Sequence, residues 1–335
     1  MSAGRSPSLT VAVLAATVLA VGACSSGSSG EGGDSGGEGS TRSVTDVQGT
    51  EVEVPVAPER VVALSEPTLD GVLALGVTPV GATSGRGQST VPGYLSEKAD
   101  RVPIVGAVGE PDLEAIGKAD PDLILVDGTT ISQDDSVLAT LRKIAPTVVA
   151  GEAGGDWRTT FTNVAGALNR SDEGEQVVAD YEDHVAQVNG ELGDRLDDTY
   201  SIVRWQGSSA SLILKELPAG VALTDLGMKR PDSQDREGEG HSEPVSQENI
   251  ADIDADYIFF GTLGGSSVSN PSATGSTDAD AAESALKEAE EVPGFTKLQA
   301  YQDDHIIAVD GSVWTSTGGP LLMNAIVDDV EASLT

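Results

Sequence analysis

LEAIGKADPDLILV, residues 113–126, has a counterpart later in the chain in QENIADIDADYIFF, residues 247–260. Aligned without a gap, the two stretches place Glu114 on Glu248, Asp120 on Asp254 and Asp122 on Asp256. Each stretch predicts a short helix, an Asp-containing turn and then a buried apolar strand. The pair therefore indicates one α/β unit built twice, with chance similarity of two common units as the alternative.

The sequence before residue 150 has the pattern of alternating strands and helices. After a predicted hairpin at residues 43–55, the apolar run Val61–Leu64 predicts a buried strand, and residues 69–77 have helical spacing closed by Gly76. The segments TPVGAT, VPIVGA and DLILVD predict further short strands. Strands that alternate with helices favour a parallel sheet flanked by helices.

The middle of the chain predicts a long helix. Residues 174–196 carry one apolar stripe, made of Val177, Val178, Tyr181, Val185, Val188 and Leu192. Strand patterns resume with SIVRW, SLILKE, DYIFF and HIIAVD, and polar loops are predicted at 231–243 and 264–284. We therefore expect an α/β fold of two lobes with mostly parallel central sheets: residues 43–172, a bridging helix at 173–197, and residues 198–335.

The first 42 residues predict export and anchoring. An apolar run from Leu9 to Ala23 follows a single positive charge and is too short to span a membrane, which is typical of a secretory signal at residues 1–23. Val21–Cys24 resembles the processing box of bacterial lipoproteins, so Cys24, the only cysteine, is the expected lipidation site. The rest of residues 24–42 is mostly Gly, Ser and acidic residues and predicts a flexible linker. An ordinary signal peptide cut nearby is the alternative.

The charge of the chain limits the kinds of molecule that it can bind. It has 54 acidic and 19 basic residues, a formal net charge of −35 at pH 7. That excess repels the phosphates of nucleic acids, so we expect no nucleic-acid partner. It also fits a surface protein kept soluble by its acidity.

Motifs that would favour an enzyme or a bare-metal carrier are lacking in the sequence. There is no HExxH motif and no P-loop, and the SxxK match at residues 284–287 has neither KTG nor SDN with it. His184, His241 and His305 are scattered, which is poor for a site that needs three or four converging ligands. We expect no catalytic residues, no cofactor and no protein-bound metal.

The order and spacing of several segments resemble a known family, the substrate-binding lipoproteins of ABC importers. The resemblance covers Ser43 to Leu334 and lies within the group that has two α/β lobes, one rigid bridging helix, and ferric siderophores, haem or cobalamin as ligands. The segments that carry it are VTDVQGTEVEVP, PERVVAL, PDLEAIGKADPDLILV, DLGMKRPDSQ, VSQENIADIDADYIFF and VDGSVWTSTGGPLLMNAIVDDV. It implies a monomer that delivers a ferric siderophore, or a similar metal chelate, to an ABC permease from the extracellular face of the membrane.

The resemblance also implies a docking role for two carboxylates. In this family an acidic residue on each lobe meets arginines of the permease, and the matching positions here are Glu114 and Glu248. One negative charge on each lobe would fix the orientation of docking more than it adds affinity. The alternative is two solvated glutamates that are favourable near helix N-termini.

The ligand is expected between the lobes, where loops follow the carboxyl ends of the strands. That rule selects Ser65, Glu66, Arg86, Tyr94, Arg204, Trp205, Arg230 and Trp314, with Trp157 as a further wall. Aromatic faces would cover the organic shell of a ferric siderophore, and guanidinium groups would bind its anionic oxygens. The alternatives are a core position for Trp157, surface positions for Arg86 and Arg230, and a helix-terminal carboxylate at Glu66.

The class of chelate is open in the sequence. Net acidity disfavours anionic catecholate complexes and gives hydroxamate complexes a slight preference. If Arg86, Arg204 and Arg230 all face the cleft, their local field can reverse that preference. Haem and cobalamin remain alternatives for the same fold.

Overall fold

The first of two central sheets lies in the N-terminal half of the chain. The computed structural model describes residues 40–131, 135–238, 242–265 and 276–335. The first sheet has the order β4-β3-β7-β8 and all of its strands are parallel. Its strands are β3 (Val61–Ala63), β4 (Gly81–Ala82), β7 (Leu123–Asp127) and β8 (Thr147–Gly151). Every residue of these strands is buried, as expected for a parallel sheet covered on both faces.

The second sheet lies in the C-terminal half and is mixed. Its order is β11-β10-β9-β12-β13, in which β9, β12 and β13 are parallel and β10 pairs antiparallel with both of its neighbours. The strands are β9 (Tyr200–Gln206), β10 (Ser209–Leu212), β11 (Glu243–Val245), β12 (Tyr257–Thr262) and β13 (Ile306–Val309). The α/β class, with mostly parallel sheets flanked by helices, is therefore confirmed.

The internal repeat has a shared structural role. Its two strands, β7 and β12, take equivalent inner positions, each beside the strand that comes first in the chain order of its sheet. Asp122 accepts the backbone N–H groups of Glu59 and Arg60, just before β3. Asp256 accepts the backbone N–H and the hydroxyl of Thr199, just before β9. The two aligned aspartates thus make equivalent contacts, because each hydrogen-bonds the segment just before the neighbouring strand.

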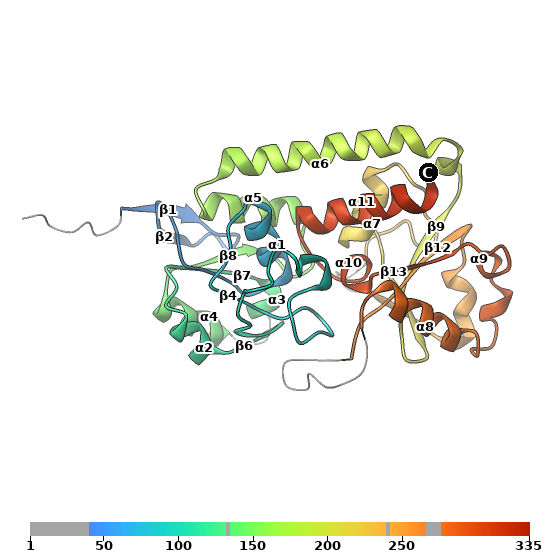
Figure 1. Cartoon of the computed structure of the whole chain (residues 1–335), viewed down its shortest axis with the longest axis horizontal. Coiled ribbons are helices and arrows are strands. Elements are labelled where there is room, and N and C mark those ends of the chain that lie inside the picture. Colours follow the sequence, from blue (N-terminus) through green and yellow to red (C-terminus); the bar gives the residue numbers. More distant parts are fainter. Residues whose placement is uncertain (1–39, 132–134, 239–241, 266–275) are drawn as a thin grey trace, which may run out of the picture. The chain divides into compact units, whose positions relative to one another are not determined.

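Helices cover both sheets (Figure 1). In the N-terminal half these are α1 (Glu66–Ala74), α2 (Leu113–Lys118), α3 (Gly128–Ile131), α4 (Asp135–Ile144) and α5 (Trp157–Ala167), with a 3-10 turn η1 (Gly93–Leu95). In the C-terminal half they are α7 (Pro218–Asp225), α8 (Ala279–Ala289), α9 (Gln299–Gln302), α10 (Gly311–Trp314) and α11 (Pro320–Leu334), with η3 (Gln247–Ile253) and η4 (Phe295–Lys297). Two small antiparallel pairs complete the fold: β1 (Thr41–Thr45) with β2 (Glu51–Pro55), and β5 (Gly106–Ala107) with β6 (Glu110–Pro111).

The long helix predicted in the middle of the chain is α6 (Ser171–Leu192), which continues as the 3-10 turn η2 (Gly193–Asp197). It packs against α5 and α11 (Figure 1). Its buried stripe includes Tyr181, Val185 and Val188, as the sequence pattern predicts. The helix ends at Leu192 rather than Leu196 because Gly193 takes a positive φ of 52°.

Three further details of the sequence prediction differ from the structure. Residues 279–284 were expected in a loop, but they open α8, since the Asp278 carboxylate accepts the backbone N–H of Ala281 and caps the helix. Strand β8 was not predicted. VPIVGA forms the short antiparallel β5 and an isolated bridge from Ile104 to Ala82 instead of a full parallel strand.

Some predictions lie outside the described residues: the signal peptide, Cys24, almost all of the linker, His241 and part of the 264–284 loop. Of the helices in the described part of the chain, none combines the length and the apolar character that a membrane crossing requires.

Candidate functional site

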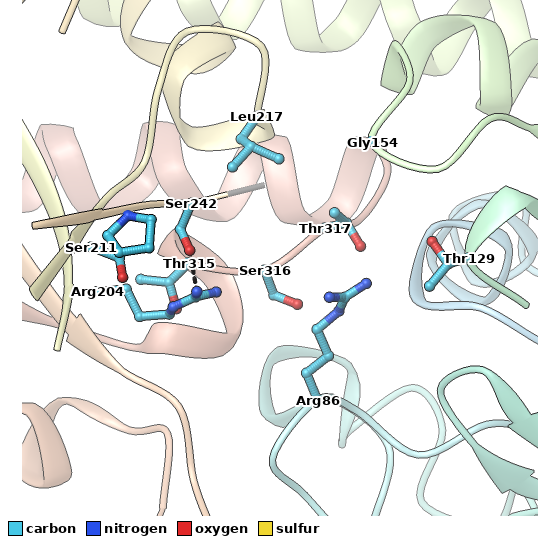
Figure 2. Close-up of a pocket in the computed structure, with 11 residues that line it drawn as sticks. Arg86, Thr129, Gly154, Arg204, Ser211, Leu217, Ser242, Thr315, Ser316 and Thr317 are labelled. Carbon is cyan, nitrogen blue, oxygen red and sulfur yellow. Dashed lines mark hydrogen bonds between the residues drawn. The ribbon is translucent and has the colours of Figure 1, made fainter. Parts of the chain in front are cut away.

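A cavity of about 320 Å³ lies between loops of the two halves. It is lined by Arg86, Thr129, Gly154, Arg204, Ser211, Leu217, Ser242, Pro244, Thr315, Ser316 and Thr317. Arg86 and Thr129 follow strands of the first sheet, whereas Arg204 and Ser211 belong to the second. Figure 2 shows Arg86 and Arg204 reaching toward the same space from different elements. The cavity therefore lies where the carboxyl ends of the parallel strands converge, as the strand-end rule requires.

Arg86 is held at the cavity by a buried carboxylate. Its Nε lies 3.2 Å from Glu66 Oε2, and its backbone N–H donates to Oε1 at 2.8 Å. Glu66 is only 3% exposed and stands in the first turn of α1. The hydroxyls of Ser316 and Thr317 also donate to Oε2, at 3.0 and 3.4 Å. Glu66 thus joins the N-terminal half to the segment that precedes α11, and it neutralises Arg86.

Arg204 has a different environment. Its guanidinium donates to the Ser242 hydroxyl, and no carboxylate forms an ion pair with it among the described residues. Desolvation by burial, followed by the charge of Arg86, lowers the pKa of Arg204 from its usual value. A cation whose charge is destabilised by its surroundings, and which faces a cavity, gains from an anionic ligand.

Asp127 was not singled out in the sequence, although it ends β7 at the same edge of the sheet. Its Oδ1 accepts the backbone N–H groups of Thr129 and Thr130, at 2.9 and 3.3 Å. Desolvation raises the pKa of this carboxyl to about 6, against the opposing effect of those hydrogen bonds. The signal that could have found it is its position, since it is the last residue of DLILVD.

We expect Asp127→Asn to stabilise the protein at pH 7.5. The asparagine Oδ1 can keep both backbone hydrogen bonds, and the cost of burying a charge disappears. The pKa of Asp127 is higher in the folded protein than in the unfolded chain. The wild-type protein therefore loses stability as the pH rises from about 4 to 6, and its stability stays at the lower level at higher pH. The gain at pH 7.5 is roughly 2 to 3 kcal/mol and vanishes below pH 4. Urea denaturation of both proteins across this range measures it; equal stabilities at every pH would contradict it.

Ser65 and Tyr94, both predicted site residues, organise the cavity's surroundings rather than line it. Ser65 is buried and caps α1 through a capping box with Thr68. The Tyr94 hydroxyl donates to Asp70 at 2.9 Å. Asp70, fully buried, also accepts the backbone N–H groups of Leu321 and Leu322 in the first turn of α11. Desolvation outweighs these bonds and raises the pKa of Asp70.

The three tryptophans and Arg230 are buried, at 3, 1, 0 and 7% exposed for Trp157, Trp205, Trp314 and Arg230. Trp205 packs on Phe260 and Phe295, and Trp314 stacks on Phe259 at 4.0 Å between ring centroids. Trp157 contacts Tyr181 edge to face and borders a pocket of about 10 Å³ that shares Thr129, Gly154 and Thr317 with the cavity. Arg230 donates to Ile213 O and Gln234.

Two of the nine predicted ligand residues, Arg86 and Arg204, therefore line the cavity directly. The tryptophans pack in the interior because adjacent aromatic residues of the second sheet and of α6 cover them. The sequence missed the hydroxyl groups of Thr129, Ser211, Ser242, Thr315, Ser316 and Thr317, which make up most of the polar lining. Serine and threonine are so common in loops that their types alone carry no signal.

Glu114 and Glu248 are both exposed, each in the first turn of its repeat helix, α2 and η3. Glu114 pairs with Lys118 at 2.6 Å, a solvated i,i+4 contact that adds little stability. Glu248 borders an open hollow of about 520 Å³ with Ile250, Pro293, Lys297 and others. The repeat thus carries one accessible carboxylate on each half.

The cavity suits an anionic, oxygen-rich ligand. Its described lining offers guanidinium and hydroxyl groups, and it contains no carboxylate, imidazole or thiolate that would bind a bare metal ion. Two α/β halves with a long helix beside them and a polar cavity between their strand ends define the class of two-lobed solute-binding proteins.

Comparison with known proteins agrees with this class. Residues 61–313 match the model of the periplasmic binding protein family, and the chain belongs to that family. It is therefore a binding protein and not an enzyme.

Individual relatives are similar over most of the chain. A Bacillus subtilis protein described as probable siderophore-binding lipoprotein YfiY is 32% identical and covers 87% of each chain. The Fe(3+)-citrate-binding protein YfmC of the same organism is 26% identical over 92% of this chain and 91% of its own. The crystal structure of Staphylococcus aureus SirA complexed with staphyloferrin B has a TM-score of 0.70 at 26% identity, covering 88% of this chain and 99% of that one.

Proposed function

We propose that this protein binds a ferric siderophore in the cavity between its halves and delivers it to an ABC importer. The observation that carries the proposal is Arg204, a desolvated guanidinium facing a hydroxyl-lined cavity with Arg86 beside it. The relatives named as binding a siderophore or ferric citrate support it. Haem and cobalamin are the other ligands that the fold could accept.

Within the siderophores, two electrostatic effects oppose each other. The net charge of −35 favours hydroxamate complexes, which are neutral or cationic. The charges of Arg86 and Arg204 act at the cavity itself, whereas salt screens the distant surface carboxylates beyond about 8 Å. We therefore rank ferric complexes with anionic carboxylate oxygens above the hydroxamates that the sequence alone favours.

Titration of the purified protein tests both the binding of a ferric siderophore and the ranking of carboxylate above hydroxamate complexes. Ferric citrate, ferrioxamine B, ferric enterobactin, haemin and cyanocobalamin are added separately while tryptophan emission and heat are followed. We expect saturable binding of at least one iron chelate, with the carboxylate complex tighter than ferrioxamine B. Binding of haemin or cyanocobalamin alone would overturn the siderophore assignment, and tighter binding of ferrioxamine B would restore the hydroxamate preference.

We further propose that Glu114 and Glu248 dock the protein on its permease. Both are exposed, and the repeat places them at equivalent positions of the two halves. Paired carboxylates would set the orientation of the complex. Lipidation of Cys24 would keep the protein at the extracellular face of the membrane, near its permease.

Reversing both charges separates docking from ligand capture. We expect Glu114→Lys together with Glu248→Lys to leave chelate affinity unchanged and to lower iron uptake by cells at least about tenfold, because like charges then face the permease. The matched control is Glu283→Lys on α8, another exposed glutamate. Uptake by the double variant equal to that by the control would rule out this docking role.

A further inference from the structure

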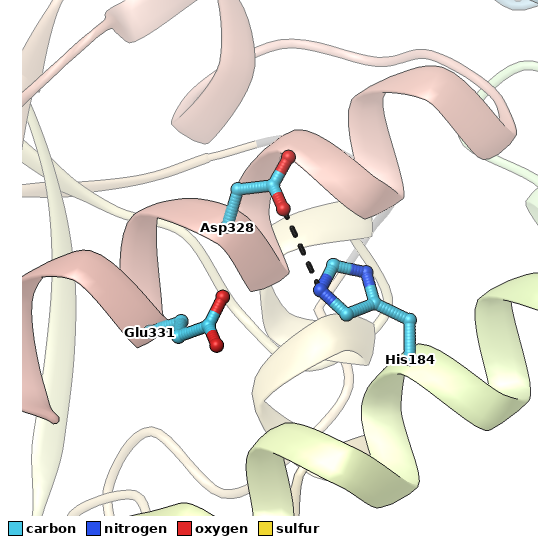
Figure 3. A group of neighbouring side chains, drawn as sticks. All are labelled: His184, Asp328 and Glu331. Carbon is cyan, nitrogen blue, oxygen red and sulfur yellow. Dashed lines mark ion pairs between the residues drawn. The ribbon is translucent and has the colours of Figure 1, made fainter.

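A second group of metal-ligating side chains lies outside the cavity, between α6 and α11. His184 of α6 faces Asp328 and Glu331, which stand three residues apart on α11 (Figure 3). One potential ligand atom from each of the three side chains lies within 4.8 Å of the others. Two helices distant in sequence thus bring one imidazole and two carboxylates to one place.

The imidazole is oriented by a neighbour that is itself fixed. Asn324 Nδ2 donates to the carbonyl of Pro320 at 2.9 Å, so its Oδ1 is the atom that faces His184 Nδ1, also at 2.9 Å. An amide oxygen accepts, and Nδ1 must therefore carry a proton. With Nδ1 protonated, Nε2 is the ring nitrogen left to bind a cation, and it lies 3.5 Å from Asp328 Oδ1.

A metal ion held between Nε2 and the Asp328 carboxylate would be bound by both groups. Histidine ligands commonly donate their other ring N–H to a fixed acceptor, which is the arrangement of Asn324 here. Two ligand atoms of a tetrahedral zinc site stand about 3.4 Å apart, given metal–ligand distances of about 2.0 to 2.1 Å. The distance of 3.5 Å between His184 Nε2 and Asp328 Oδ1 is close to this value.

We propose that His184, Asp328 and Glu331 bind a divalent transition-metal ion of the zinc type. Nitrogen with two carboxylate oxygens suits Zn²⁺, whereas Ca²⁺ and Mg²⁺ prefer all-oxygen sites. None of the three residues lines the cavity between the two halves, so this site is separate from that of the chelate. The ion would join α6 to α11, the helix whose first turn Asp70 holds.

Zinc binding to the purified protein tests the site. The protein carries Cys24→Ser, so that no thiolate competes, and is freed of metal by a chelator before calorimetric titration with ZnCl2. We expect one Zn²⁺ per chain and no comparable binding of CaCl2 or MgCl2. At 100-fold excess over the Kd, Zn²⁺ should raise Tm by about 5 °C.

Three variants separate a coordinated ion from loose attraction to an acidic surface. His184→Gln should abolish the binding, and Asn324→Leu should weaken it about tenfold by freeing the imidazole. The control His305→Gln removes an imidazole that stacks on Tyr257 and should bind as the parent does. Absence of zinc binding, equal affinity in His184→Gln, or equal affinity for CaCl2 would each overturn the proposal. Far-UV circular dichroism shows that each variant is folded.

Discussion

Replacing Arg204 with glutamine is expected to weaken binding of an anionic ferric siderophore by about 10- to 100-fold, because a hydrogen bond to a charged group contributes about 1.5 to 3 kcal/mol. Arg204 has only a hydroxyl partner among the side chains described around it, and burial destabilises its charge before the ligand arrives. A ligand carboxylate relieves that cost. Calorimetric titration with the chelate that the wild type binds most tightly measures the loss.

Two further arginine variants make the result specific. Arg86→Gln should cost less than Arg204→Gln, since Glu66 already neutralises Arg86 in the unliganded protein. Arg101→Gln is the matched control, because its side chain is 90% exposed and contacts only Asp100 as an ion pair among the described residues. Wild-type affinity in Arg204→Gln would show that this guanidinium faces the cavity without contacting the ligand.

These arginines also show which features of the site could be predicted from the sequence. The position of a residue after a strand could be predicted, since a parallel sheet brings its carboxyl ends to one edge, and Arg86 and Arg204 were found in this way. Arg204 and Trp205 could not both face the cavity, however, because successive side chains of one strand point to opposite faces of the sheet. Trp205 alternates with Arg204 on β9 and so faces the opposite side of the sheet, where it packs on Phe260.

Long-range polar contacts could not be predicted from the sequence, for a different reason. Glu66 and Asp70 contact residues about 250 positions away, and no local pattern indicates such partners. The same holds for His184 and the carboxylates of α11. The three histidines look scattered in the sequence, and only the packing of two helices reveals what stands beside one of them.

Asp70→Ala is expected to lower the free energy of unfolding by about 3 to 5 kcal/mol, since it breaks a buried hydrogen-bond network. The substitution leaves the backbone N–H groups of Leu321 and Leu322 and the hydroxyl of Tyr94 without their buried acceptor. Each orphaned group costs about 1 to 3 kcal/mol, and removal of a desolvated carboxyl offsets part of the sum. Urea denaturation at pH 7.5 followed by circular dichroism measures the change.

Tyr94→Phe is the milder variant for comparison, because it removes one hydrogen-bond donor and leaves Asp70 with its backbone partners. We expect it to lower the free energy of unfolding by about 1 kcal/mol. Asp70 follows Glu66 by one helical turn of α1, so one face of that helix holds both the start of α11 and the hydroxyls of Ser316 and Thr317. Asp70→Ala should therefore also weaken chelate binding, since those hydroxyls line the cavity. A stability loss below 1 kcal/mol, or unchanged chelate affinity in a destabilised variant, would show that α11 and the cavity are positioned independently of α1.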